Sequence, residues 1–153
     1  MTNKKISFDD FEVGGRIELG SKDVTRDEVI AFAAVYDAQP MHLDDGAARD
    51  GMLGALSASG WHTIAMFMRL LCDNLLLKAH SLGSPGIDKV RWLRPVFPGD
   101  RLTAVAEVME TRASKSRPEL GIVRFRFTVT NQSGEAVMTM ENPIMFATRE
   151  AAA

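Results

Sequence analysis

The sequence predicts an α+β domain in which a curved antiparallel sheet wraps around one long apolar helix. Two patterns support this fold class. The segment Trp61–Leu77 has apolar residues in almost every direction around a helical axis, which indicates a helix enclosed by other structure. After Pro85 the pattern changes to alternating apolar and polar residues in segments joined by short turns, which is typical of consecutive antiparallel strands.

A first helix is predicted upstream of the long one. Thr25 and Glu28 have the spacing of a capping box, which satisfies the first free amides of a helix. Apolar spacing extends this helix to about Val35. It must end soon afterwards, because Pro40 disfavours helical geometry in the residue before it. A second, shorter helical turn is predicted around Asp45–Asp50.

Four strands are predicted after the long helix, at Asp88–Arg94, Arg101–Glu110, Gly121–Asn131 and Glu135–Phe146. The third is the clearest, because its apolar and polar residues alternate strictly, so that one face is buried and the other meets water. A short extended piece is predicted around Arg16–Leu19. The last residues, Ala151–Ala153, are expected to be frayed.

Composition limits the range of functions. The 153 residues suit a single domain, with its core at about 11–147. The 18 basic and 20 acidic side chains give a net charge of −2, without the basic excess expected of a nucleic-acid-binding protein. Cys72 is the only cysteine, and the sequence starts without a secretory signal pattern, so a cytoplasmic protein is expected. Gly51–Met68 is uncharged, but its glycines and polar residues argue against a membrane helix.

The segment that carries chemistry follows the first helix. Asp37 and His42 are five residues apart with Pro40 between them, so their side chains can converge on one small volume. A carboxylate beside an imidazole can share one water, where one group takes a proton and the other supplies one. Taken alone, the pair is a weak signal and is more simply explained by a capping aspartate and a histidine in a turn.

A glycine at the start of the long helix adds context to this pair. Gly60 lies eighteen residues after His42, and a glycine there lets a ligand approach the backbone closely. The first amides of a helix lack internal partners and lie at the positive end of the helix dipole. They would stabilise a thioester carbonyl that develops negative charge. Alternatively, Gly60 only permits tight packing at the helix start.

Three segments together resemble a known family. They are Asp37-Ala38-Gln39-Pro40-Met41-His42, the Ser59-Gly60 pair, and Arg91–Leu102 with its Pro-Gly-Asp bend. In this combination the chain resembles the MaoC-like acyl dehydratases, which include the (R)-specific enoyl-CoA hydratases. The resemblance extends from Phe11 to Phe146.

The resemblance implies a hotdog fold, normally a homodimer or a dimer of dimers. It implies that Asp37 and His42 are the catalytic pair and that the Gly60 amide is the oxyanion donor. The substrates would be acyl groups carried as thioesters of coenzyme A or acyl carrier protein, with no other cofactor. Gln39 replaces the family's usual Asn, and Ser59 replaces its usual His, which leaves the substrate open.

Further residues are candidates for substrate binding: Gln39, Ser59, His62, Arg94, Lys115 and Arg117. His62 lies two residues after Gly60, but a polar residue in the first turn of a buried helix is more often structural. The basic residues suit the phosphates of coenzyme A, although such residues commonly only solvate a strand or hairpin. A metal site built from His42, Asp44, Asp45 and His62 lacks the spacing of a ligand motif, so no metal is predicted.

The expected activity is reversible addition of water to a trans-2-enoyl thioester, which gives a 3-hydroxyacyl thioester. Two alternatives remain open, a hotdog acyl-CoA thioesterase and a non-catalytic acyl-thioester-binding protein, because fold alone does not separate them. The sequence does not define the acyl chain length, the carrier or the pathway.

Overall fold

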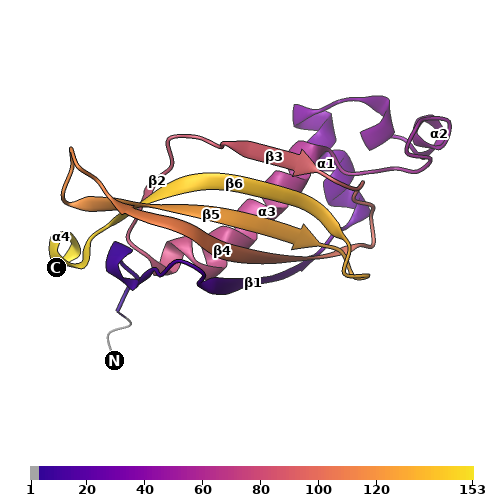
Figure 1. The fold of residues 1–153 in the computed structure, drawn as a ribbon. Helices are drawn as coiled ribbons and strands as arrows, with labels where there is room; N and C mark the ends of the chain where they lie inside the picture. Colours follow the sequence, from indigo (N-terminus) through magenta and orange to yellow (C-terminus); the bar gives the residue numbers. More distant parts are fainter. Residues whose placement is uncertain (1–3) are drawn as a thin grey trace.

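A computed structural model describes residues 4–153 (Figure 1). Within them six strands form one antiparallel sheet in the order β1-β4-β5-β6-β2, and β3 also pairs with β6. The strands are β1 (Arg16–Asp23), β2 (Ser81–Gly83), β3 (Lys89–Trp92), β4 (Arg101–Ala113), β5 (Leu120–Thr130) and β6 (Ala136–Ala147). The helices are α1 (Arg26–Tyr36), α2 (Asp45–Arg49), α3 (Gly60–Asn74) and α4 (Arg149–Ala152), with 3-10 turns η1 (Phe8–Asp10), η2 (Pro40–His42) and η3 (Leu76–Lys78).

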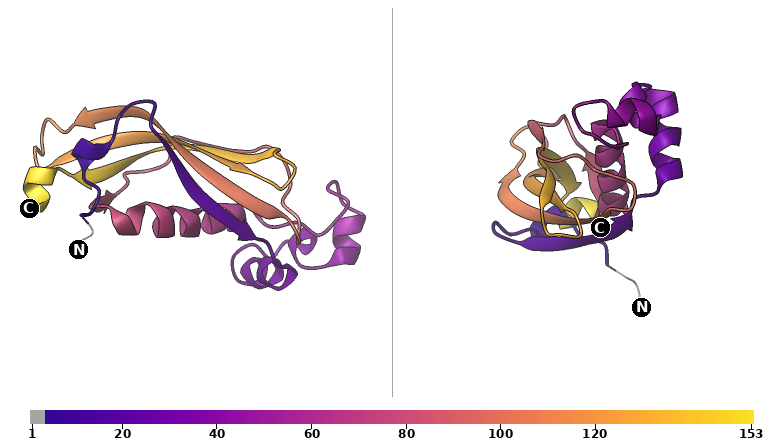
Figure 2. Two further views of the ribbon diagram at one scale, coloured as in Figure 1. Left: turned by 90° about the horizontal axis from the view of Figure 1, so that it is seen from below. Right: turned by 90° about the vertical axis from the view of Figure 1, so that its right-hand side faces the viewer.

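The sheet arches over α3, while α1 and α2 lie together beyond one end of the arch (Figure 2). Aromatic rings join the two layers: the ring centroids of Phe67 on α3 and Phe127 on β5 are 4.7 Å apart. Each large apolar side chain buried in this way contributes roughly 1.5–3 kcal/mol. The inner face of β5 is fully buried at Val123, Phe125, Phe127 and Val129. The predicted α+β fold, a curved antiparallel sheet around a central helix, is confirmed.

Several predicted boundaries differ from those in the structure. The long helix ends at Asn74 and continues only as η3, so the predicted Trp61–Leu77 segment contains two elements. The extended piece at Arg16–Leu19 is the first half of β1, an eight-residue strand paired with β4. The predictions missed β2, because its three residues are too few to show an alternating pattern. No helix within residues 4–153 is long and apolar enough to cross a membrane.

The expected fraying of Ala151–Ala153 is wrong for most of this segment. Residues 149–152 form α4, and the Thr148 hydroxyl accepts a hydrogen bond from the Ala151 amide at 3.2 Å. The Arg149 guanidinium donates to Asp10 Oδ1 at 2.5 Å and joins this helix to η1. One local and one long-range hydrogen bond thus hold a segment whose composition alone gives no sign of order.

One side of α3 is not covered by the sheet. Trp61 is 60% exposed and Met68 is 43% exposed, so a single chain encloses the helix only partly. We therefore predict a homodimer or a dimer of dimers, in which a second copy covers this side. Analytical ultracentrifugation at micromolar concentration should show the dimer or a larger closed assembly. A monomer under these conditions would contradict the prediction.

Candidate active site

Asp37 and His42 meet at the end of α1. The amide of Asp37 donates to the Ala33 carbonyl at 2.9 Å and closes the last turn of the helix. Pro40 then begins η2, which turns the chain back and brings His42 Nε2 to 3.5 Å from Asp37 Oδ2. The prediction that these two side chains converge is confirmed.

The orientation of the His42 ring is set by a backbone carbonyl. His42 is only 5% exposed, and its Nδ1 lies 2.7 Å from the carbonyl oxygen of Ser57. Because a carbonyl can only accept a hydrogen bond, Nδ1 must carry a proton. In the neutral ring Nε2 is therefore unprotonated, and this nitrogen faces Asp37. His42 Nε2 is therefore a proton acceptor that lies beside the Asp37 carboxylate.

Asp37 is held as a carboxylate by two neighbouring side chains. The Ser59 hydroxyl donates to Oδ2 at 2.6 Å, and the Gln39 amide donates to Oδ1 at 2.7 Å. These hydrogen bonds, that of Ser59 first, lower the pKa of Asp37 and outweigh the opposing effect of burial. Ser59 also accepts from the Trp61 amide at 3.2 Å, so one hydroxyl connects Asp37 to the first turn of α3.

A prediction follows for the Ser59→Ala variant. Loss of the strongest hydrogen bond to the Asp37 carboxylate should raise its pKa. Because a depressed pKa keeps the carboxylate ionised as pH falls, the variant should lose activity at higher pH than wild type does. The acid limb of the pH dependence of kcat/KM measures this shift. An unchanged acid limb would show that Ser59 does not control the ionisation of Asp37.

Gly60, the first residue of α3, has both of the properties considered for it. Its amide has no acceptor in the described part of the chain, and the residue lines a cavity shared with Asp37 and His42. A Cβ atom at this position would also lie 2.5 Å from Cε2 of Trp92, whose Nε1 donates to the Gly60 carbonyl at 3.0 Å. The tight-packing explanation for this glycine therefore holds, and its amide hydrogen has no acceptor within residues 4–153.

The cavity beside the pair has a volume of about 450 Å³. Most of its wall is apolar, and its polar lining residues are Asp37, Gln39, His42, Thr63 and Arg94. Arg94 is a predicted binding residue that reaches this cavity, although it also pairs with Glu135 Oε2 at 3.0 Å. Ser59 is fully buried behind Asp37 and acts by positioning it rather than by lining the cavity.

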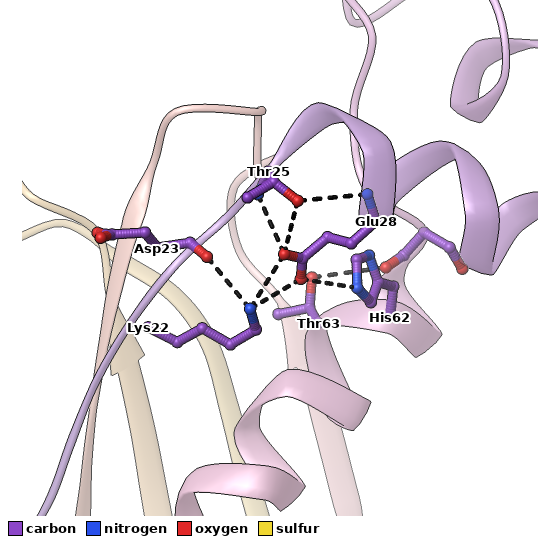
Figure 3. A network of polar contacts seen from close by, with 7 residues as sticks. Lys22, Asp23, Thr25, Glu28, His62 and Thr63 are labelled. Carbon is purple, nitrogen blue, oxygen red and sulfur yellow. Dashed lines mark hydrogen bonds and ion pairs between the residues drawn. The ribbon is translucent and has the colours of Figure 1, made fainter.

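His62, a candidate binding residue, does not line the cavity that Asp37 and His42 share. Two residues along a helix rotate a side chain by roughly 200°, so His62 faces away from the side that Gly60 presents. Its ring stacks on Phe32 with centroids 4.8 Å apart, and its Nε2 lies 3.3 Å from Glu28 Oε1, in a network with Lys22 (Figure 3).

His62 is neutral in this network. Burial has the largest effect on the pKa of His62 and lowers it; the charge of Glu28 raises it by less, and the charge of Lys22 lowers it further. The neutral ring donates from Nε2 to Glu28, so its Nδ1 is an unprotonated acceptor. This buried Nδ1 receives no hydrogen bond from the described residues.

The other two predicted basic residues also lie away from the cavity. Lys115 and Arg117 belong to the hairpin between β4 and β5, and Arg117 pairs with Glu119 at 2.7 Å. The thirteen residues of β4 span about 40 Å, which separates this hairpin from the end of the sheet that holds Asp37 and His42. Across residues 4–153 no three His, Cys, Asp or Glu side chains are placed to share a metal ion.

Comparisons with known proteins agree with this architecture. Residues 11–131 match the family model of the MaoC like domain. A MaoC-like dehydratase from Rhodospirillum rubrum is 37% identical with a TM-score of 0.88, over 94% of this chain and 98% of that one. The (R)-hydratase from A. caviae involved in PHA biosynthesis is 29% identical with a TM-score of 0.71, over 88% of this chain and 96% of that one.

Mesaconyl-CoA hydratase from Cereibacter sphaeroides is 29% identical over 154 residues, which are 99% of this chain but only 44% of that protein. An uncharacterized Bacillus subtilis protein, YdeM, is 26% identical over 92% of this chain and 98% of its own length. The family model covers most of the chain, and the folds agree along its length. The chain therefore belongs to the MaoC-like dehydratase family of hotdog-fold proteins.

Proposed function

We propose that the protein is an acyl-thioester hydratase that adds water reversibly to a trans-2-enoyl thioester of coenzyme A or acyl carrier protein. The observation that carries this proposal is the 3.5 Å approach of Asp37 Oδ2 and His42 Nε2 in a cavity that Gly60 also lines. The hydratase and dehydratase names of several relatives support the same class of reaction.

The Gly60 amide receives the thioester carbonyl in this mechanism. As water adds to the double bond, negative charge moves onto the thioester oxygen. An N–H group without an internal partner, at the positive end of the fifteen-residue helix α3, stabilises that charge. Ground-state substrate gains less from this contact, so the contact lowers the barrier rather than only tightening binding.

One water lies between Asp37 and His42 in the proposed complex. Asp37, as a carboxylate, orients this water and stabilises the imidazolium that forms when His42 Nε2 takes a proton. The water oxygen bonds to the β-carbon, and the pair returns one proton to the α-carbon on the same face. The substrate gains one molecule of water, and both side chains end in their starting states. Coenzyme A or acyl carrier protein takes part only as the carrier.

A screen of 2-enoyl-CoAs with short, medium and branched chains tests this proposal. Hydration removes the ultraviolet absorbance of the enoyl thioester without releasing free thiol. We expect that result for at least one chain. Thiol release without hydration would instead identify an acyl-CoA thioesterase, and tight binding without either reaction would identify a binding protein.

A further inference from the structure

A second cavity, of about 310 Å³, lies between α3 and β6. No charged residue lines it, and its walls include Phe67 and Leu71 of α3, Ser84, and Met140, Asn142 and Ile144 of β6. Its α3 residues follow directly on Gly60 and Thr63, which line the first cavity. At about 1.5 Å of rise per residue, the centre of the second cavity is roughly 9 Å further along the helix.

The second cavity lies beside a gap in the strand pairing of β6. β3 pairs with Met138–Glu141 and β2 pairs with Met145 and Phe146, so residues 142–144 have no strand partner on this side. Pro143 is compatible with this gap because proline has no N–H for a strand partner. The segment 84–87 runs along the gap and supplies part of the cavity wall.

Asn142 is the polar residue of β6 that lines this cavity. It is 8% exposed, and its Oδ1 is buried without a hydrogen-bond donor in the described part of the chain. Its neighbours on the same strand face, Met140 and Ile144, line the cavity too. A buried carbonyl oxygen in apolar surroundings is destabilising until a donor reaches it.

Ser84 fixes the orientation of the Asn142 amide. The Ser84 hydroxyl lies 2.5 Å from the Pro143 carbonyl oxygen and 2.9 Å from that of Gly86. Because both groups can only accept, the one hydroxyl proton is engaged there, and the Ser84 oxygen is the acceptor for Asn142 Nδ2 at 3.5 Å. The amide of Gly86 donates to the same oxygen at 3.3 Å. Turning the Asn142 amide over would set Oδ1 against an oxygen whose proton is already engaged. The Asn142 atom that is left without a partner is therefore an acceptor, on a residue that lines the cavity.

We infer that the second cavity receives the far end of the acyl chain and that Asn142 makes the protein prefer a chain that carries a hydroxyl group there. This rests on the proposed function, which places the thioester at Gly60. The carrier lies on the side of the first cavity, because Arg94 lines that cavity and suits the phosphates of coenzyme A or of the acyl-carrier-protein arm. No charged residue lines the second cavity. The apolar part of the acyl chain packs against the walls of the second cavity, and its terminal hydroxyl donates a hydrogen bond to Asn142 Oδ1.

Binding of saturated acyl-CoAs tests this inference without requiring catalysis. Chains of four to ten carbons are compared, each with its ω-hydroxy counterpart, by calorimetry on the full chain. Wild type should bind the ω-hydroxy form about tenfold more tightly at the lengths that reach Asn142 and should show no preference at four carbons. Asn142→Leu, which has a similar size but no acceptor, should reverse the preference.

Thr139→Val is the matched control, because Thr139 lies on the opposite face of β6 and the change also replaces a polar group with an apolar one of similar shape. It should keep the wild-type preference. The wild-type comparison decides the question even if Asn142→Leu fails to fold.

Three results would overturn the inference. The first is equal affinity of wild type for both forms at every chain length. The second is an equal loss of affinity at all lengths in Asn142→Leu, which would place the carrier in this cavity. The third is an altered assembly state of Asn142→Leu with an unchanged preference, which would place a second copy of the chain there. A preference for ω-hydroxy chains without any hydration of enoyl-CoAs would refute the proposed function alone. Hydration without the preference would refute this inference alone, and binding of no acyl-CoA would refute both.

Discussion

Replacing Gly60 with alanine is expected to lower kcat/KM for hydration by about 100-fold, the loss that a misplacement of about 1 Å can cause. The added Cβ would lie 2.5 Å from Trp92 Cε2, so the indole must move. Its movement breaks the 3.0 Å hydrogen bond from Nε1 to the Gly60 carbonyl and changes the cavity wall at the proposed carbonyl site. Circular dichroism should stay native, because the change leaves the other fourteen of the fifteen residues of α3 as they are.

A second variant separates packing from the amide itself. Trp92→Ala removes the side chain that the new Cβ would meet, while the backbone N–H of residue 60 is kept. The double variant Gly60→Ala/Trp92→Ala should therefore be no worse than Trp92→Ala alone. If Gly60→Ala lowers kcat/KM by the same factor whether or not Trp92 is present, the glycine is required for ligand approach rather than for packing.

The Asp37→Asn and His42→Ala variants should each reduce turnover by about 10²–10⁴-fold, the usual contribution of positioned acid–base groups. Asparagine keeps the shape of the Asp37 side chain but cannot act as a carboxylate beside His42. Alanine at position 42 removes the nitrogen that lies 3.5 Å from Asp37 Oδ2. Substrate binding should survive in both variants, because neither side chain holds the carrier.

The double variant tests whether the two residues act as a unit. If they share one water, the double variant should be little worse than the worse single one, since such effects are not additive. Hydration rates and ligand affinities are measured for all four proteins after each is shown to be folded. If the activity losses of the two single variants multiply in the double variant, the two residues do not share one water. Full activity in Asp37→Asn would remove Asp37 from the mechanism.

Much of the fold could be predicted because long elements repeat their pattern. The alternation in β5 spans eleven residues, and its predicted bounds differ from the observed ones by one residue. The convergence of Asp37 and His42 was also predictable, since Pro40 between them forces a turn. β2 and α4 were missed, because elements of three and four residues are held by particular partners rather than by a sequence pattern.

The rest of the site depends on contacts that have no residue signature. The acceptor that orients His42 is the backbone carbonyl of Ser57, and every residue type supplies such a group. Trp92 reaches Gly60 only because β3 pairs with β6 at one edge of the sheet. The separation of His62 from the cavity follows from helical rotation alone, which turns this residue away from the side of Gly60.

The most direct test of the central claim is hydration of a trans-2-enoyl-CoA in ¹⁸O-labelled water, followed by mass spectrometry of the products. The proposed reaction predicts one ¹⁸O atom in the hydroxyl group of an intact 3-hydroxyacyl-CoA, made by wild type and nearly lost in Asp37→Asn. A label found only in the carboxyl group of a free acid would show thioester hydrolysis instead, and the proposed hydratase reaction would be contradicted.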